Sequence, residues 1–262
     1  MITKIGKTAI ELAKNITGVF SLLVSILYWA VVGPFKGKAA ARQSIFSQMI
    51  FAGLSSGLIV FFVTIFTGIV LAMQSAYQLQ KMGAVLYVAS LVAISLCREL
   101  SPVLTALVVA GRVGSAIAAE LGTMKVSEQI EALETMAINP VRFLAVPRFL
   151  ALFFMLPCLT IIGNISGMLG GYLVGVYSLK INPDLYIQTT FKYLEIKDIY
   201  TGITKSFVFA VIIALIGCFE GLNTKGGAEG VGRATTRSVV ISFILIILAD
   251  CVVTAIFYFS KI

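Results

Sequence analysis

Apolar residues occur in long uninterrupted runs along this chain, and the polar and charged residues gather between the runs. Five runs are long enough to cross about 30 Å of hydrocarbon as helices. They cover residues 45–73, 85–110, 149–177, 203–222 and 239–259. Continuous runs argue against the alternating strands of a membrane barrel. The pattern predicts an all-α polytopic membrane protein.

A shorter apolar run at residues 16–32 follows a basic leader and contains Tyr28 and Trp29 near its end. Its length is at the lower limit for a span, and its flanks are equally typical of a helix lying in the membrane interface. No small-residue cleavage site follows, which disfavours a cleaved signal peptide. We expect one domain over residues 1–262, with an N-terminal interfacial region at 1–44 and a transmembrane core at 45–262.

The basic residues indicate an orientation if the N-terminus is cytoplasmic and five spans follow. Thirteen then lie on the cytoplasmic side: Lys4, Lys7, Lys14, Lys36, Lys38, Arg42, Arg112, Lys125, Arg142, Arg148, Lys225, Arg233 and Arg237. Five lie outside: Lys81, Lys180, Lys192, Lys197 and Lys261. This asymmetry predicts a cytoplasmic N-terminus and an outer C-terminus. A sixth span at residues 16–32 would move the three leader lysines outside and weaken the bias.

Composition supports a membrane protein and removes several kinds of chemistry. Hydrophobic residues make up 59% of the chain and charged residues 12%, against about 25% charged in soluble domains. The net charge of +8 forms no continuous basic stripe for nucleic acid. Cys97, Cys158, Cys218 and Cys251 lie in apolar runs without CxxC spacing, so neither disulfides nor zinc are expected. The absence of histidine excludes catalysis by histidine and metal sites built from histidine.

Four charged residues fall within or at the edge of the predicted spans: Arg98, Glu99, Lys205 and Asp250. Charges inside a membrane are costly and usually face protein or water. Neighbours in sequence project about 100° apart on a helix, so Arg98 and Glu99 need not pair with each other. Lys205 and Asp250 are candidate partners. A structural ion-pair network and a substrate site are both compatible with this pattern.

Four glycines recur at every fourth position of the third strong span: Gly163, Gly167, Gly171 and Gly175. Such a stripe of small residues lets two helix backbones approach closely. We favour packing within the chain over a subunit interface.

The connection between the second and third strong spans has the pattern of a short amphipathic helix at residues 127–138. Its spacing predicts an apolar face formed by Val126, Ile130, Leu133 and Ala137. Ser127 is the expected N-cap, and Pro140 closes the segment. Glu128, Glu131 and Glu134 give an acidic polar face, whereas lipid-binding helices favour Lys and Arg. A protein partner is therefore the favoured contact.

A glycine-rich stretch at residues 226–237 lacks the Gly-Lys-Ser/Thr ending of a phosphate-binding loop. Gly6-Lys7-Thr8 has that ending but lacks the upstream glycine. Neither is a Walker A motif, so we expect this chain not to hydrolyse ATP. The stretch at 226–237 is expected to form a flexible turn before the last span.

Three segments resemble the MlaE family of ABC transporter permeases, also called the YrbE family. They are the connection that contains helix 127–138, the glycine-rich stretch 226–237, and Arg98-Glu99-Leu100-Ser101-Pro102. The resemblance extends from about residue 45 to residue 259, and Ser101 replaces the commoner glycine. It implies a homodimeric bacterial inner-membrane permease with an interfacial helix and five spans. Its implied partners are a cytoplasmic ABC ATPase, which binds ATP and Mg, and a periplasmic MCE-domain protein. The implied cargo is phospholipid moving between inner and outer membranes.

The resemblance also implies roles for particular residues. Helix 127–138 becomes the coupling helix for the ATPase, with contacts from Glu120, Ser127, Glu128, Gln129, Ile130, Glu131 and Leu133. A lipid cavity would have Arg98 and Glu99 at its floor, and Leu71, Gln74, Ala76 and Tyr77 in its wall.

Two alternatives from other classes stay open. A secondary transporter or channel could use the four intramembrane charges as an ion path, although no inverted repeat supports it. A non-transporting membrane scaffold is the other alternative.

Overall fold

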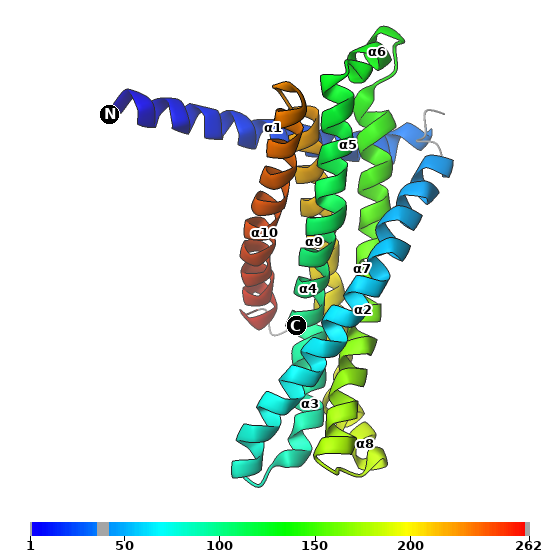
Figure 1. The fold of residues 1–262 in the computed structure, drawn as a ribbon, viewed down its shortest axis with the longest axis vertical. Coiled ribbons are helices and arrows are strands. Elements are labelled where there is room, and N and C mark those ends of the chain that lie inside the picture. The colour runs from blue at the N-terminus through cyan, green and yellow to red at the C-terminus, as the bar shows by residue number, and fades with distance from the viewer. Residues whose placement is uncertain (1, 36–41, 260–262) are drawn as a thin grey trace. The chain divides into compact units, whose positions relative to one another are not determined.

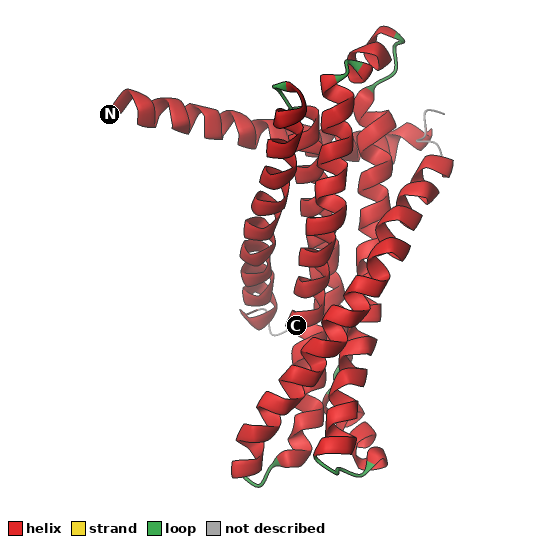
Figure 2. Cartoon of the chain, viewed as in Figure 1, coloured by secondary structure: helices red, strands yellow, loops and turns green. Residues whose placement is uncertain are grey.

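Helices account for nearly all of the described structure (Figures 1 and 2). The computed structural model describes residues 2–35 and 42–259, with side chains from residues 14–33 and 42–259. No strand occurs within those ranges. The helices are α1 (Ile2–Phe35), α2 (Arg42–Lys81), η1 (Val85–Tyr87), α3 (Val88–Ser95), η2 (Leu96–Leu100), α4 (Ser101–Val109), η3 (Ala110–Gly114), α5 (Ser115–Val126), α6 (Gln129–Thr135), η4 (Val141–Ala145), α7 (Val146–Leu173), η5 (Val174–Ser178), α8 (Pro183–Tyr193), α9 (Ile196–Leu222) and α10 (Gly227–Phe259).

The predicted all-α membrane architecture is confirmed, and every predicted span is helical. In the described ranges, six helical stretches are long and apolar enough to cross a membrane: Lys14–Gly33, Arg42–Lys81, Val85–Val126, Val141–Ser178, Ile196–Leu222 and Gly227–Phe259. The last five contain the five predicted runs and extend beyond them, because helical hydrogen bonding continues into the polar flanks. The first belongs to α1.

Two polar connections of the chain form helices. Residues 180–200 contain α8, whose first turn is capped by Asn182: its side-chain oxygen accepts a hydrogen bond from the Asp184 N–H at 2.9 Å. The expected flexible turn at 226–237 is wrong, because α10 begins at Gly227. Only Gly226 and Gly227 have the positive φ angles of a turn there, +92° and +67°, which favour glycine.

The chain divides into two compact units, each built from separate segments. Unit 1 comprises Met1–Met49, Ala110–Leu152 and Val211–Phe243, and unit 2 comprises Ile50–Val109, Phe153–Ala210 and Ile244–Ile262. The boundaries between the units fall within helical stretches, and the expected boundary at residue 44 stays a prediction. The single permease domain stays a prediction.

Three of the basic residues used to predict the orientation, Lys36, Lys38 and Lys261, lie outside the described residues. All remaining Lys and Arg residues that were predicted to be cytoplasmic belong to unit 1. All remaining Lys residues that were predicted to lie outside belong to unit 2.

In unit 1, α1 runs crosswise to α5 and to the first turns of α10 (Figure 1). One face of α1 is packed: Ile26 is buried, and the Trp29 ring lies 5.4 Å from the Arg142 guanidinium. Its other face exposes Ile16, Phe20, Val24 and Val31. A helix that lies across its neighbours with one apolar face uncovered has the arrangement expected of an interfacial helix.

Small residues bring α5 and α9 close together in unit 1. A Cβ atom added at Gly217 would lie 3.1 Å from the Gly114 carbonyl oxygen, and one at Gly221 would lie 2.7 Å from the Leu121 Cβ. Ser238 of α10 donates a hydrogen bond to the Gly114 carbonyl at 3.5 Å. The end of α9 is therefore fixed against the segment that leads into α6.

In unit 2, the glycine stripe packs within the chain, as expected. Gly163 lies against Thr64 and Thr105, and Gly167 lies against Leu96. Gly171 and Gly175 make room for the ring of Tyr186 on α8. The hydroxyls of Thr64 and Ser166 approach to 2.5 Å between α2 and α7. The stripe is thus filled by neighbouring elements of the same unit.

Gly170 of α7 provides a test of this close packing. A Cβ atom there would overlap the Ile65 carbonyl oxygen of α2. We expect Gly170→Ala to lower the free energy of unfolding by about 1–3 kcal/mol, the usual cost of overpacking. Gly232→Ala is the matched control, since nothing lies within 4 Å of its Cβ position. At both positions the replacement of glycine by alanine raises helix propensity by about 1 kcal/mol, so this effect cancels in the comparison. Thermal unfolding of the purified variants measures the difference, and equal melting temperatures would contradict the packing.

Candidate functional site

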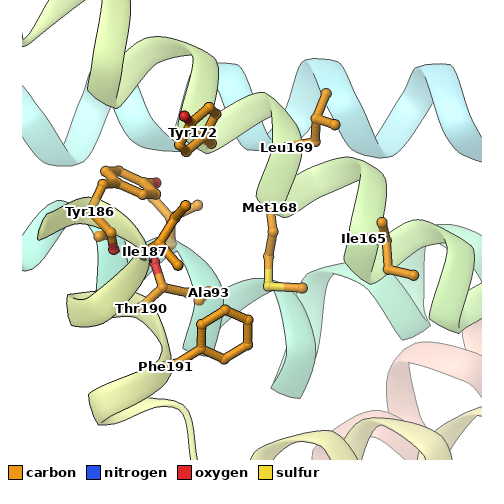
Figure 3. A pocket seen from close by; sticks show the side chains of 11 residues that line it. Ala93, Ile165, Met168, Leu169, Tyr172, Tyr186, Ile187, Thr190 and Phe191 are labelled. Atoms are coloured by element: carbon orange, nitrogen blue, oxygen red, sulfur yellow. Dashed lines mark hydrogen bonds between the residues drawn. The ribbon is translucent and has the colours of Figure 1, made fainter. Parts of the chain in front are cut away.

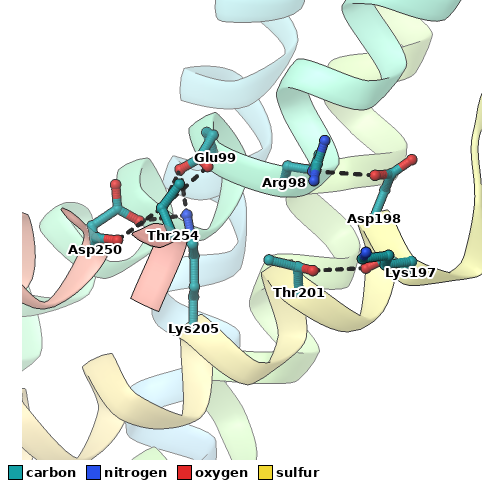
Figure 4. Close-up of polar contacts among 8 residues, drawn as sticks. All are labelled: Arg98, Glu99, Lys197, Asp198, Thr201, Lys205, Asp250 and Thr254. Carbon is teal, nitrogen blue, oxygen red and sulfur yellow. Dashed lines mark hydrogen bonds and ion pairs between the residues drawn. The ribbon is translucent and has the colours of Figure 1, made fainter. Parts of the chain in front are cut away.

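Arg98 and Glu99 lie in η2, a π-helical turn between α3 and α4. Such turns are rare and occur frequently at functional sites. The two side chains point to different partners, as the sequence suggested. Arg98 faces Asp198 at the start of α9, while Glu99 faces Lys205, also of α9, and Thr254 of α10 (Figure 4).

Lys205 is the centre of this charged cluster. Its side chain has no exposed surface. The ammonium donates a hydrogen bond to the Glu99 carboxylate and lies 2.8 Å from Oδ1 of Asp250. The contact with Asp250 is an ion pair. A buried cation without partners would carry a desolvation penalty of several kcal/mol, so the two carboxylates are required for the lysine to lie there.

Thr254 completes the polar contacts of Glu99. Its hydroxyl lies 3.3 Å from Oε1 of Glu99 and 2.8 Å from the Asp250 carbonyl oxygen, to either of which it can donate its one proton. Of the candidate partners, Lys205 pairs with Glu99, and Asp250 joins the cluster through Lys205. The α10 helix contributes a hydroxyl as well as a carboxylate.

Asp198 is a member of the cluster that the sequence predictions missed. Its Oδ1 lies 3.2 Å from Nε of Arg98, and its side chain is 8% exposed. Its Oδ2 also accepts a hydrogen bond from the Glu195 N–H at 3.1 Å, which caps the start of α9. The available signal was an acidic residue just before an apolar run. That signal is shared by many ordinary helix starts.

A pocket of about 270 Å³ opens beside Arg98 and Glu99. Both side chains are partly exposed in it, at 40% and 39%. The remaining lining combines hydroxyls with apolar and aromatic groups: Ile94, Ser95, Thr201, Thr254, Phe257 and Tyr258. The pocket therefore offers one cation and one anion beside an apolar wall.

The four predicted wall residues do not line this pocket. Ala76 is buried and Leu71 half-buried in a hydrophobic cluster around Val88 and Leu96. Ala76, at 4% exposed, is therefore not available to an open wall. Gln74 and Tyr77 are exposed on α2, and Tyr77 accepts a hydrogen bond from Lys81 at 3.1 Å. Their role in a cavity stays a prediction.

The predicted helix at 127–138 is divided differently in the structure. The helix of the second span continues to Val126, and α6 occupies only Gln129–Thr135. Ser127 is not an N-cap, because its hydroxyl donates to the Thr123 carbonyl at the end of α5. Glu128 takes the position before α6 with φ +59°, and Ala137 has φ +58°.

The expected continuous apolar face is therefore wrong. Ile130 is buried and Leu133 half-buried, but Val126 and Ala137 are exposed. The left-handed residues Glu128 and Ala137 bracket α6 and break the helical register that the spacing assumed. Ile130 anchors α6, while Gln129, Glu134 and Met136 stay exposed.

Two of the predicted coupling carboxylates are engaged inside unit 1. Oε2 of Glu120 on α5 lies 2.8 Å from Nη2 of Arg148, a buried side chain that also donates a hydrogen bond to the Leu144 carbonyl at 2.6 Å. Glu131 pairs with Lys125, whose hydrogen bond lowers the pKa of the Glu131 carboxyl. Glu128 and Glu134 make no ion pair with another described residue, so they form the more available acidic surface.

Comparison with known proteins decides the family. The model of the MlaE permease family, "Permease MlaE", matches residues 45–256. The chain belongs to the MlaE permease family. The matched residues include the charged cluster of unit 2 and the whole of α5 and α6.

Several curated relatives of this MlaE-family permease are similar over nearly its whole length. A "Probable ABC transporter permease protein" of Rickettsia typhi is 42% identical over 97% of this chain and 96% of its own. Another so named, of Synechocystis, is 42% identical over 80% of each chain. The protein TRIGALACTOSYLDIACYLGLYCEROL 1, chloroplastic, of Arabidopsis thaliana is 37% identical over 85% of this chain and 63% of its own. The chain is thus a multi-pass ABC transporter permease, a membrane subunit rather than a catalyst.

Removal of the buried cation tests the cluster in this permease. We expect Lys205→Met to lower the free energy of unfolding by about 3–5 kcal/mol, because it leaves two carboxylates without their counter-ion. Adding Glu99→Gln and Asp250→Asn is expected to restore most of the loss. Lys225→Met is the control, since Lys225 is exposed and has no ion pair with a described residue. Thermal unfolding measures the stability of the single variant, the triple variant and the control. A triple variant no more stable than Lys205→Met would contradict the ion-pair explanation.

Proposed function

We propose that this chain is the permease subunit of an ABC transporter that moves phospholipid between the inner and outer membranes of a bacterium. It acts as a homodimer with a cytoplasmic ATPase, which binds ATP and Mg, and with a periplasmic MCE-domain protein. The chain lies in the inner membrane with its N-terminus in the cytoplasm. Membership of the MlaE family supports this proposal, and so does similarity to a plant protein named after a galactosyl diacylglycerol.

The pocket beside Arg98 and Glu99 carries the proposal of a phospholipid cargo. A zwitterionic headgroup has a phosphate for the guanidinium and an ammonium for the carboxylate, and its chains suit Phe257 and Tyr258. Asp198 contacts Nε of Arg98, which leaves the terminal N–H groups for phosphate oxygens, a pairing that arginine geometry favours. Apolar walls with a few polar groups are typical of such sites.

The surface around α6 supports the proposal of an ATPase partner. Glu128, Gln129, Glu134 and Met136 are exposed there, and an acidic face is not typical of a helix resting on anionic lipid. The ion pair between Glu120 and Arg148 ties α5 to the start of α7. Movement of α6 would therefore be transmitted to two long helices.

The two-unit distribution of basic residues supports the proposed orientation. Arg112, Arg148 and Arg237 belong to unit 1 together with α6, whereas Lys81 and Lys192 belong to unit 2. An excess of Lys and Arg marks cytoplasmic segments. Unit 1 would then carry the cytoplasmic ends of the helices.

Charge reversal on α6 tests the coupling. We expect Glu128→Lys with Glu131→Lys to lower lipid-stimulated ATP hydrolysis and ATP-dependent lipid transfer of the reconstituted complex by about tenfold or more. Repulsion at the docking surface is the physical reason, since like charges brought together cost several kcal/mol. Glu229→Lys is the matched control, because Glu229 is an exposed carboxylate on α10.

The separate contributions are resolved by single variants. Glu128→Lys alone should show most of the loss, because Glu131 is already paired with Lys125. Normal hydrolysis and transfer in the double variant, with the subunit inserted, would refute the coupling role. Lipid transfer that persists without any ATPase would favour a secondary transporter, and ATP hydrolysis that never depends on this subunit would favour a scaffold.

A further inference from the structure

A second pocket lies in unit 2 among α3, α7 and α8, with a volume of about 410 Å³ (Figure 3). Its volume is within the range of roughly 300–1,000 Å³ found for small-molecule sites. It shares no lining residue with the pocket beside Arg98 and Glu99. The lining is almost wholly apolar: Ala89, Val92, Ala93, Ile165, Met168, Leu169, Tyr172, Tyr186, Ile187, Thr190 and Phe191.

The pocket has a polar end and an apolar end. Along α7 its lining runs from Ile165 to Tyr172, a rise of about 10 Å. Tyr172 lies toward the end of this span and next to Tyr186 of α8, with their ring centroids 5.6 Å apart. Tyr172 is six residues before the end of this span at Ser178, and α8 is not itself a candidate span, so the two tyrosines mark the end of the pocket nearer the connection that follows the span. From the tyrosines the lining extends along α7 to Met168 and Ile165 (Figure 3).

Tyr186 is the observation that indicates a ligand. Its side chain is 4% exposed, yet its hydroxyl makes no hydrogen bond with any residue that the structure describes. The hydroxyl oxygen itself is not fully enclosed by protein atoms, so it is open to a hydrogen-bond partner from outside the chain, and tyrosine hydroxyls in apolar surroundings usually have one. The hydroxyl lies over Gly171, 3.2 Å from the position of an added Cβ. Burial raises the pKa of this phenol to about 12, so it stays a proton donor.

We propose that this pocket binds one alkyl chain of a membrane lipid, with an oxygen at the head of the chain accepting a hydrogen bond from Tyr186. The acceptor is an ester or carboxylate oxygen, supplied by a phospholipid or by a free fatty acid. An α-helix is a cylinder about 10 Å across, so a volume of about 410 Å³ would hold only about one of its turns. The site is independent of the proposed transport function, because a resident lipid would stabilise α8 in any membrane protein.

Photolabelling of the full-length chain in lipid nanodiscs tests this proposal. One arm contains phosphatidylethanolamine with a diazirine on one acyl chain, and the other contains a diazirine fatty acid. After irradiation, mass spectrometry quantifies adducts on peptides of α3, α7 and α8 relative to the exposed Ile244 and Ile247 of α10. We expect enrichment on the pocket peptides in at least one arm, and that arm identifies the source of the chain.

Two variants with matched controls make the test specific. Ile187→Trp fills the pocket from a half-exposed position and should reduce labelling about tenfold, whereas Leu185→Trp, equally exposed on α8 but outside the lining, should not. Tyr186→Phe keeps the ring and removes the hydroxyl. It should reduce labelling about threefold to tenfold, the net value of one hydrogen bond, while Tyr177→Phe leaves labelling unchanged.

Three results would overturn the proposal. The first is labelling of the pocket peptides no higher than that of α10 in both arms. The second is equal labelling in Ile187→Trp and Leu185→Trp. The third is full labelling in Tyr186→Phe. This variant keeps the proposal testable even if Ile187→Trp does not fold.

Discussion

The burial of one ammonium group constrains unit 2 more than any other interaction. Lys205 has no exposed surface, and the surroundings of a membrane span offer no water to solvate it. Glu99 and Asp250 must therefore approach it from two other helices. Three positions far apart in sequence are fixed by a single charge, and η2, α9 and α10 are held in one arrangement as a result.

This constraint determines what the neighbouring pocket presents. Glu99 is held by Lys205 and Thr254 but keeps 39% of its side chain exposed. Arg98 is held through Nε by Asp198 and keeps 40% exposed. The cluster thus immobilises two opposite charges at the edge of an apolar pocket without neutralising either one completely. A pre-formed site of this kind loses little entropy when an amphipathic molecule binds.

The sequence predicts the spans well because their signal is local. Run length and hydropathy identified every predicted span, and the cost of isolated charges indicated that Lys205 and Asp250 belong with the Arg98-Glu99 pair. Asp198 was missed because its contact with Arg98 depends on how η2 and α9 pack. The α8 helix was missed although Asn182 and Pro183 are a typical helix start, because its composition is polar. Ser127 was placed wrongly because Glu128 adopts a left-handed conformation that residue spacing does not reveal.

Capture of the cargo in the charged pocket tests the central claim most directly. The photoreactive residue benzoylphenylalanine replaces Tyr258, which lines that pocket, in the complete complex. The same substitution at the exposed Ile247 reports on surrounding lipid. We predict a phospholipid adduct at position 258 whose yield changes when ATP is hydrolysed, while the yield at position 247 stays constant. An adduct at 258 that is absent, or that responds to ATP no differently from the one at 247, would contradict a lipid pathway through this pocket.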